Sequence, residues 1–174
     1  VTGLTISKEQ LEFAQNRIKN KNLEDKVTFK LQDYRDEKGT YDGIASIEMF
    51  EAVGEKYWPA YFQTLRDCLH PGRNATLQII TVSDERWEVY RRGVDFIQKY
   101  IFPGGMLPCP SVLRTEVEKA ELEVVKSVQF GESYSKTLRL WYDGFNQTWE
   151  QVAELGFDDR FKRMWNFYLT SCAS

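Results

Sequence analysis

The sequence predicts an α/β fold in which helices cover both faces of a sheet. Apolar patterns typical of strands and of helices follow one another in the order strand, helix, strand, strand, helix, strand. Residues 75–82 are nearly all apolar, as expected for a strand buried on both faces. Glu48 and Glu51 directly follow the apolar run 44–47, so two carboxylates should lie at the carboxyl edge of the sheet, where open α/β folds bind ligands.

Residues 1–4 begin the series as a predicted strand. Ser7 then precedes residues at helical spacing, in a Ser-x-x-Gln pattern that predicts a capping box for a helix ending near residue 22. Residues 27–31 alternate between apolar and polar side chains and predict the second strand. The polar segment 33–36 follows as its loop.

The middle of the chain predicts two more strands around one helix. Residues 41–47 form the third strand, and residues 57–69 have helical spacing with Pro59 in the first turn, where its missing N–H does no harm. Pro71-Gly72 should end this helix. Residues 75–82 then form the fourth strand.

The remaining chain predicts four helices and one strand. A single amphipathic helix should cover residues 85–101, and Ser111 should cap a short helix that ends at Ala120. Residues 122–130 predict the fifth strand. Two aromatic-rich helices should follow, over residues 134–155 and from residue 158 to the end.

The composition excludes several classes of protein. A chain of 174 residues without a linker or repeat should form a single domain, residues 1–174. The net charge of −3 argues against a nucleic-acid partner held by a basic face. One histidine, and three cysteines without metal-type spacing, argue against a metal site and for reduced thiols. No apolar run is long enough for a membrane span and no signal pattern is present, so we expect a cytoplasmic protein.

Polar groups follow three predicted strands, and each group has two explanations. Thr5 and Gln10 stand where a nicotinamide-binding domain has an acidic residue. A ribose site is one explanation of these residues, and an ordinary helix N-cap is the one that the spacing alone favours. Asp33 has a carboxylate that can accept a hydrogen bond from the adenine amine, and Tyr34 has a ring that can stack on the adenine. An ordinary polar turn explains the two residues as well. Glu51 is a candidate acid or base, or a solvated glutamate at the start of a helix.

Four motifs stand in order along the chain: Gly-Leu-Thr-Ile-Ser-x-x-Gln from residue 3, Leu-Gln-Asp-Tyr-Arg-Asp from residue 31, Met-Phe-Glu-x-Val-Gly from residue 49 and Thr-Leu-x-x-Trp-Tyr from residue 137. Together they resemble the cyclopropane-fatty-acyl-phospholipid and mycolic acid cyclopropane synthases, bacterial class I S-adenosylmethionine-dependent methyltransferases of lipid biosynthesis. The resemblance implies a Rossmann-like class I methyltransferase sheet truncated at both ends. Its first and last strands and its glycine-rich cofactor loop would lie outside this sequence, so residues 1–174 alone should bind the cofactor weakly and be inactive.

The resemblance also implies a role for each candidate residue. In this family a methyl carbon passes from S-adenosylmethionine to the cis double bond of an unsaturated acyl chain, and bicarbonate serves as the base that permits ring closure. The cofactor should be lined by Thr5, Gln10, Asp33, Tyr34 and Ile47, while Glu51 and Tyr142 should face the reacting carbon. From spacing alone, the aromatic residues around Tyr142 would be assigned to a helical core.

Two positions depart from the family pattern. Ala52 and Ile80 stand where the family typically has histidines, the latter a bicarbonate ligand. This leaves open a methyltransferase that adds a methyl or methylene branch to an acyl chain or small molecule without closing a ring. A non-catalytic lipid-binding module is a further alternative.

The resemblance implies an unsaturated acyl phospholipid as the substrate, and therefore transient contact with a membrane surface, peripheral at the inner membrane face. A solvated surface is the default explanation of two clusters of basic residues, and contact with anionic head groups is the functional alternative. The clusters contain Arg91, Arg92, Lys99, Arg160, Lys162 and Arg163. A homodimer is left open.

Overall fold

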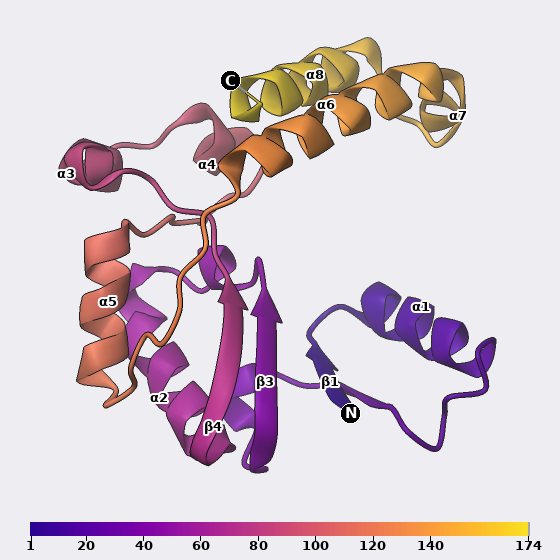
Figure 1. The fold of residues 1–174 in the computed structure, drawn as a ribbon. Coiled ribbons are helices and arrows are strands. Elements are labelled where there is room, and N and C mark those ends of the chain that lie inside the picture. Colours follow the sequence, from indigo (N-terminus) through magenta and orange to yellow (C-terminus); the bar gives the residue numbers. More distant parts are fainter. Residues whose placement is uncertain (174) are drawn as a thin grey trace. The chain divides into compact units, whose positions relative to one another are not determined.

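A computed structural model of the chain describes residues 1–173, which form two compact units (Figure 1). The first unit contains residues 1–94 and 104–123, and the second contains residues 95–103 and those from 124 onward. Within the described chain the strands form two pairs, both parallel. The predicted α/β character is therefore confirmed, with the strands confined to the first unit.

The first pair consists of β1 (Thr2–Thr5) and β2 (Thr28–Leu31), joined by helix α1 (Lys8–Lys19). Ser7 caps α1 as predicted, because its Oγ accepts a hydrogen bond from the backbone N–H of Gln10 at 3.2 Å. The reciprocal half of the predicted capping box does not form. The side-chain oxygen of Gln10 instead accepts from the hydroxyl of Thr5 at 2.7 Å.

The second pair consists of β3 (Tyr41–Ile47) and β4 (Leu69–Gln78), joined by α2 (Trp58–Cys68). The predicted limits 75–82 of the fourth strand were wrong at both ends. β4 begins directly after α2 and contains Pro71-Gly72, which the shift in register after Tyr41 accommodates as an irregularity. It ends at Gln78 because its partner β3 ends at Ile47, so the following residues have no strand to pair with.

Aromatic side chains form the core of the first unit. Phe50 is fully buried and stacks on Trp58 at 5.2 Å between ring centroids, while the ring of Tyr61 meets it edge-on at 4.9 Å. The core is completed on one side by α5 (Pro110–Lys119), which packs against α2. Cys109, and not the predicted Ser111, precedes α5 as its N-cap residue, because Pro110 already occupies the first helical position.

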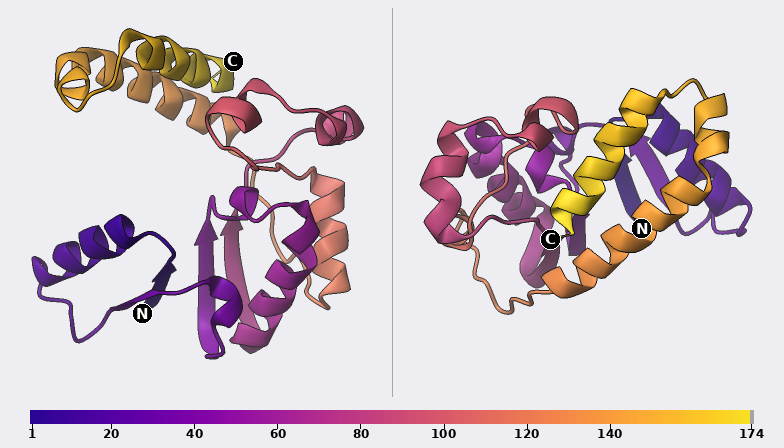
Figure 2. Two further views of the ribbon diagram at one scale, coloured as in Figure 1. Left: turned by 180° about the vertical axis from the view of Figure 1, so that it is seen from behind. Right: turned by 90° about the horizontal axis from the view of Figure 1, so that it is seen from above.

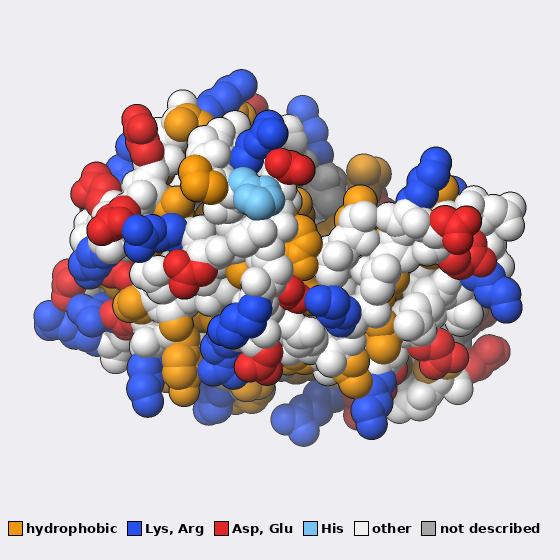
Figure 3. Space-filling model, turned by 90° about the horizontal axis from the view of Figure 1, so that it is seen from below, with side chains coloured by type: hydrophobic (Ala, Val, Ile, Leu, Met, Phe, Trp, Pro, Cys, Tyr) orange, Lys and Arg blue, Asp and Glu red, His pale blue; other side chains and the backbone are white. Residues whose placement is uncertain are grey.

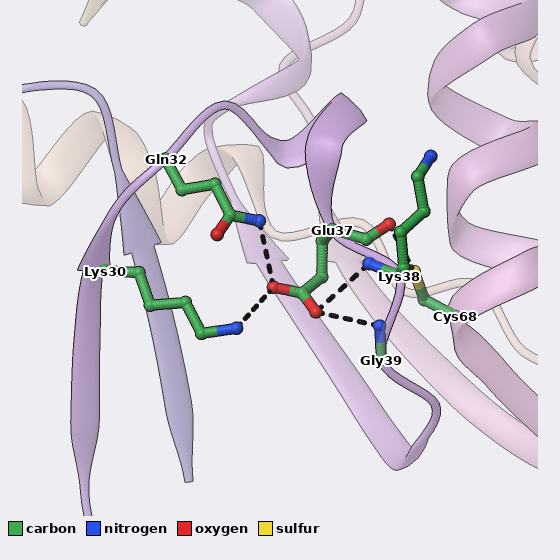
Figure 4. A network of polar contacts seen from close by, with 6 residues as sticks. All are labelled: Lys30, Gln32, Glu37, Lys38, Gly39 and Cys68. Carbon is green, nitrogen blue, oxygen red and sulfur yellow. Dashed lines mark hydrogen bonds and ion pairs between the residues drawn. The ribbon is translucent and has the colours of Figure 1, made fainter.

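Glu37 ties the end of β2 to the start of β3, as Figure 4 shows. Its Oε2 accepts from Lys30 Nζ at 2.9 Å and from Gln32 Nε2 at 3.1 Å, while Oε1 accepts from the backbone N–H of Gly39 at 2.8 Å. The hydrogen bond from Lys30 is the largest of the effects that lower the pKa of Glu37, to about 2. The ionised carboxylate therefore links two strands that the sequence separates by a loop.

Two predicted elements beyond β4 were wrong. The single helix 85–101 is two helices, α3 (Asp84–Arg92) and α4 (Phe96–Tyr100), because Gly93 ends the first and Asp95 forms a complete capping box with Gln98 that begins the second. The predicted strand 122–130 is not a strand. Its side chains from residue 123 to residue 130 are exposed, and no strand within residues 1–173 pairs with it.

The second unit is built on helices α6 (Gly131–Gln147), α7 (Trp149–Glu154) and α8 (Asp159–Cys172), with α4 packed beside them. Helices α6 and α8 lie side by side (Figure 2). Their shared core contains Leu138 and Leu169, and a pair of hydrogen bonds joins Asn146 to Asn166. The first predicted aromatic helix thus ends earlier than expected, and α7 follows it as a separate turn.

Three further features of the described residues concern the hydropathy of the helices, metal ligands and surface charge. In the part of the chain that the structure describes, no helix has the length and apolar character to cross a bilayer. Over the same residues, no three histidine, cysteine or acidic side chains gather as metal ligands would. On the face shown in Figure 3, basic and acidic side chains are interspersed.

Candidate active site

The carboxyl end of β3 turns sharply at Glu48. This residue has a φ of 49°, in the left-handed region that residues other than glycine seldom adopt. Two hydrogen bonds hold the turn: the backbone N–H of Glu48 donates to the carbonyl of Gln78 at 2.9 Å, and Gln78 Nε2 donates to Glu48 Oε1 at 2.8 Å. The turn leads directly into a short 3₁₀ helix, η2 (Phe50–Ala52), in which Phe50 enters the core.

Glu51 has two carboxylate oxygens in different environments. Oε1 accepts a hydrogen bond from the backbone N–H of Ile80 at 2.6 Å, while Oε2 is buried and has no hydrogen-bond partner among the described residues. Burial is the main cause that raises the pKa of Glu51 above its ordinary value. An anionic oxygen without a donor attracts positive charge strongly, because little solvent screens it.

Ile80 takes part in this arrangement through its backbone. The family pattern places a histidine side chain at this position, and here the main-chain N–H provides the donor that anchors Glu51. The carbonyl of Glu51 is anchored as well, since it accepts from the N–H of Met106 at 2.9 Å. Both ends of the residue are thus fixed by backbone groups of the first unit.

Thr5 and Gln10, both predicted to line the cofactor, lie in contact. The Thr5 hydroxyl donates to Gln10 Oε1 at 2.7 Å and accepts from the N–H of Ser7 at 3.1 Å. This leaves the amide NH₂ of Gln10, on an exposed side chain, to donate outward. The arrangement at the end of β1 offers a donor of the kind that a ribose hydroxyl accepts.

Asp33 and Tyr34 begin the 3₁₀ helix η1 (Tyr34–Asp36) after β2. The Asp33 carboxylate forms an ion pair with Arg35 at 2.6 Å, and Arg35 holds the pKa of that carboxyl below its usual range. The Tyr34 ring is half-buried and meets Tyr61 edge-on at 5.7 Å. Ile47, at the end of β3, keeps 57% of its surface exposed, which leaves an apolar side chain open for contact.

Tyr142 belongs to the second unit and is described within it. It lies on α6, half-buried against the core around Leu138, and lines a shallow hollow together with Arg139 and Asp143. Its carbonyl accepts from Asn146 Nδ2 at 2.8 Å. Its predicted role at the reacting carbon stays a prediction.

Tyr61 and Ser46 form a polar contact that no sequence motif indicates. Tyr61 is 1% exposed, and its hydroxyl donates to Ser46 Oγ at 2.8 Å. Burial is the first cause that raises the pKa of Tyr61 to about 12, and the charge of Glu51 adds to the shift. The only signal in the sequence was an aromatic residue at helical spacing, which indicates a core position and says nothing of a polar partner.

A sequence model of the mycolic acid cyclopropane synthetase family matches residues 1–174. The chain belongs to this family. A tuberculostearic acid methyltransferase of Mycobacterium tuberculosis is 39% identical over 170 residues, covering 97% of this chain and 40% of that protein. The cyclopropane-fatty-acyl-phospholipid synthase of Escherichia coli K12 is 37% identical over 176 residues, covering 99% of this chain and 43% of the relative.

Solved structures of cyclopropane synthases have the same fold. The crystal structure of mycolic acid cyclopropane synthase CmaA1, complexed with SAH and CTAB, superposes with a TM-score of 0.88 at 27% identity and covers 99% of this chain and 64% of that one. The predicted class I methyltransferase fold and the predicted family are confirmed by these matches. The chain spans less than half the length of the two curated relatives described above.

Proposed function

We propose that the full-length protein transfers the methyl carbon of S-adenosylmethionine to the cis double bond of an unsaturated acyl chain, carried on a phospholipid. Membership of the cyclopropane synthetase family supports this reaction, as do the names of relatives that share more than a third of the residues. Within the chain itself, the observation that carries the proposal is the buried, unpartnered Oε2 of Glu51.

The polar groups at the strand ends fit the nucleoside part of the cofactor. The amide of Gln10, positioned by Thr5, would donate to the ribose hydroxyls. Asp33 would accept from the adenine amine, and Tyr34 and Ile47 would contact the faces of the ring. When bound, S-adenosylmethionine supplies a methyl carbon attached to a positively charged sulfur.

Glu51 would act where charge develops during the reaction. The π electrons of the alkene would form a bond to the methyl carbon while the bond between that carbon and sulfur breaks and S-adenosylhomocysteine leaves. The acyl chain would then be positively charged at the other carbon of the former double bond. Oε2 of Glu51 would stabilise that charge electrostatically, and it is already oriented because Oε1 is fixed by the N–H of Ile80. A proton must then leave the added carbon for a ring to close, or a neighbouring carbon for an alkene to form.

Bicarbonate is our proposal for the base that removes this proton. Its hydroxyl group would donate to Oε2 of Glu51, which has an acceptor position available. The two histidines of the family pattern are absent, since Ala52 and Ile80 replace them, and Ile80 N–H is already used by Glu51. The chain therefore offers fewer groups to hold the base than the family pattern does.

This shortage favours a second candidate function, methyl transfer without ring closure. The relative at 39% identity is named a tuberculostearic acid methyltransferase, and not a cyclopropane synthase. In methyl transfer without ring closure, the proton would leave a carbon next to the positively charged one. The product would keep a branch and a double bond. The ring and branched alkene products have equal mass, so proton spectra of the methyl esters distinguish them by ring-methylene or alkene signals.

The test of both candidates uses the full-length protein, phospholipid vesicles with cis-unsaturated chains and S-adenosylmethionine labelled in its methyl group. The proposal predicts that labelled carbon appears in the acyl chain, with a gain of one CH₂ group in mass. Cofactor binding without any labelled lipid would instead indicate a small-molecule substrate. Lipid binding without cofactor binding would indicate a non-catalytic module, and either result would overturn the proposal.

We also propose transient contact with an anionic membrane surface through α8. Arg160 and Arg163 and the half-exposed Phe167 have the spacing that places them on one face of this helix, and all three are exposed. The cations of α3 are a weaker candidate. Arg91 pairs with Glu55 and Arg92 with Glu88, so their charges are already compensated.

A further inference from the structure

The side chain of Arg35 forms a bidentate ion pair with the carboxylate of Asp33. Arg35 Nε donates to Oδ1 at 3.0 Å, and Nη2 donates to Oδ2 at 2.6 Å. The backbone N–H of Arg35 donates to Oδ1 as well, at 2.9 Å. Paired donors of this kind fix both the position and the plane of a carboxylate, which a single point charge does not.

The guanidinium of Arg35 is itself supported by an aromatic ring. Its central carbon lies 5.5 Å from the centroid of the Tyr57 ring, within the range of a cation–π contact. Tyr57 belongs to the 3₁₀ helix η3 (Glu55–Tyr57), a few residues after Glu51. The chain of contacts from Asp33 through Arg35 to Tyr57 therefore joins the loop after β2 to the segment that carries Glu51.

The three hydrogen bonds from Arg35 leave the Asp33 carboxylate with one open acceptor position. An ionised carboxylate offers about four acceptor positions, two on each oxygen. The two bonds to Oδ1 use both positions there, and the bond from Nη2 uses one on Oδ2. One position on Oδ2 remains for a further donor.

The solvent exposure of Arg35 and Asp33 indicates whether their ion pair serves folding stability or the orientation of the carboxylate. The side chains of Arg35 and Asp33 are 50% and 31% exposed, and ion pairs so accessible to water contribute little to folding stability. The same pair lowers the pKa of Asp33 further below its ordinary acidic value, and the ionised carboxylate acts only as an acceptor at neutral pH. Orientation of an acceptor is thus a better explanation of the geometry than stability.

We propose that Arg35, seated on the ring of Tyr57, is a positioning residue that aims the open acceptor of Asp33 at the exocyclic amine of adenine. The inference rests on the proposed function and extends it to the selectivity of the cofactor site. It assigns a role to Arg35, which the motif from residue 31 contains without an assigned role, and to Tyr57, which lies outside the four motifs. A site that reads the amine in this way should reject an otherwise identical ligand with a carbonyl oxygen at that position, because two acceptors would then face each other.

The test measures the dissociation constants of S-adenosylhomocysteine and S-inosylhomocysteine by titration calorimetry on the full-length protein. The second ligand carries a carbonyl in place of the amine. We expect Arg35→Gln to weaken S-adenosylhomocysteine binding about tenfold, the size of one charge-assisted hydrogen bond, and to change S-inosylhomocysteine binding by about twofold or less. In an Asp33→Asn background, Arg35→Gln should have no further effect, since Arg35 acts through Asp33.

Further variants separate positioning from folding. Tyr57→Leu should lose part of the selectivity, and Tyr57→Phe, which keeps the ring, should retain it. Arg73→Gln is the matched control, because Arg73 forms a comparable exposed pair with Asp42. Variants are compared only where their melting temperatures equal that of the wild type. If Arg35→Gln unfolds, Arg35→Lys replaces it, because lysine keeps the positive charge and lacks the paired donors of the guanidinium.

The outcomes distinguish this inference from the proposed function. If the wild type binds no S-adenosylhomocysteine, the proposed function fails and the inference fails with it. If the wild type binds it and Arg35→Gln weakens both ligands equally, or neither, only the inference is overturned. Selective loss of the adenine ligand supports it.

Discussion

At the scale of single residues, the environment of Glu51 costs the folded protein stability, and the proposed role of this residue in the reaction would explain that cost. One carboxylate oxygen of Glu51 accepts a hydrogen bond, and the other is buried without a donor among the described residues. Burial raises the pKa of this carboxyl. Placing an ionised group where it lacks donors costs stability. Such a cost is expected where an active site keeps a charge ready for a reaction.

The first prediction concerns the effect of the Glu51 charge on folding stability. A carboxyl with a raised pKa in the folded state binds its proton more tightly there than in the unfolded chain, so folding stability falls as pH rises above the ordinary value of 4.5. Glu51→Gln keeps the oxygen that accepts from Ile80 and removes the charge. Thermal melting should show the variant more stable than the wild type at pH 7, with the difference shrinking toward pH 4. A variant less stable than the wild type at pH 7 would contradict this account of Glu51.

The second prediction concerns Tyr142, whose assigned role rests on its motif. Tyr142→Phe keeps the ring in the core around Leu138 and removes the hydroxyl. We expect methyl transfer to slow by about 10- to 100-fold, as for the loss of one group that acts in the transition state, while the affinity for S-adenosylhomocysteine stays unchanged. Tyr100→Phe, a change on an exposed ring of the same unit, is the control. Wild-type rates for Tyr142→Phe would show that the hydroxyl has no role.

Some of the site could be predicted from the sequence, for identifiable reasons. Thr5 and Gln10 lie in one local motif at the start of a helix, and the structure brings them into contact. Arg35 and Tyr57 come from separate loops, and a cation–π contact between them leaves no periodic trace in the sequence. The free oxygen of Glu51 depends on what surrounds it, and only the folded chain shows that.

At the scale of elements, the loop between β2 and β3 is held by one carboxylate. The side chain of Glu37 is only 10% exposed, and its pKa near 2 lies below the ordinary value of 4.5. Its contribution to stability is therefore present above pH 4.5 and is lost as pH falls toward 2. Glu37→Gln should destabilise the protein by about 1–3 kcal/mol at pH 7 in urea unfolding, because hydrogen bonds to a charged group are lost.

The control for this third prediction is Glu24→Gln, which removes the same charge from an exposed residue near the same strand. Its effect on the free energy of unfolding should be small. Equal effects of the two substitutions would show that Glu37 contributes only its charge. In that case its hydrogen bonds to Lys30 and Gly39 would not matter for stability.

The fourth prediction concerns the exposed face of α8. The double variant Arg160→Glu with Arg163→Glu reverses two charges and should reduce sedimentation with anionic phospholipid vesicles about tenfold or more, since each cation near such a surface contributes about 1 kcal/mol. Arg91→Glu with Arg92→Glu should have a smaller effect, because those residues are already paired. The proposed contact fails if both double variants behave like the wild type.

Boundaries of elements were harder to predict than their order. Apolar spacing continued through Gly93, so one helix was predicted where Gly93 and the capping box of Asp95 make two. The predicted strand 122–130 has an apolar pattern without a partner, and a strand needs a neighbour for its hydrogen bonds. In contrast, β3 was predicted with both of its ends, because polar residues follow its apolar run at once.

At the scale of the whole molecule, the chain has the fold of a class I methyltransferase and belongs to the mycolic acid cyclopropane synthetase family. The first unit carries Thr5, Gln10, Asp33, Tyr34, Ile47 and Glu51, and the second carries Tyr142. In the proposed reaction, the departures from the family pattern at Ala52 and Ile80 would affect the last step, in which the proton leaves.

The most direct measurement compares label transfer by the wild type and by Glu51→Gln. Full-length protein is mixed with methyl-labelled S-adenosylmethionine and vesicles of cis-unsaturated phospholipid, and label in the acyl chains is followed by mass spectrometry. We expect the wild type to label the acyl chain and Glu51→Gln to do so about 100-fold or more slowly, with unchanged affinity for S-adenosylhomocysteine. Transfer at the wild-type rate by Glu51→Gln would contradict the claim that this carboxylate stabilises the positive charge on the acyl chain.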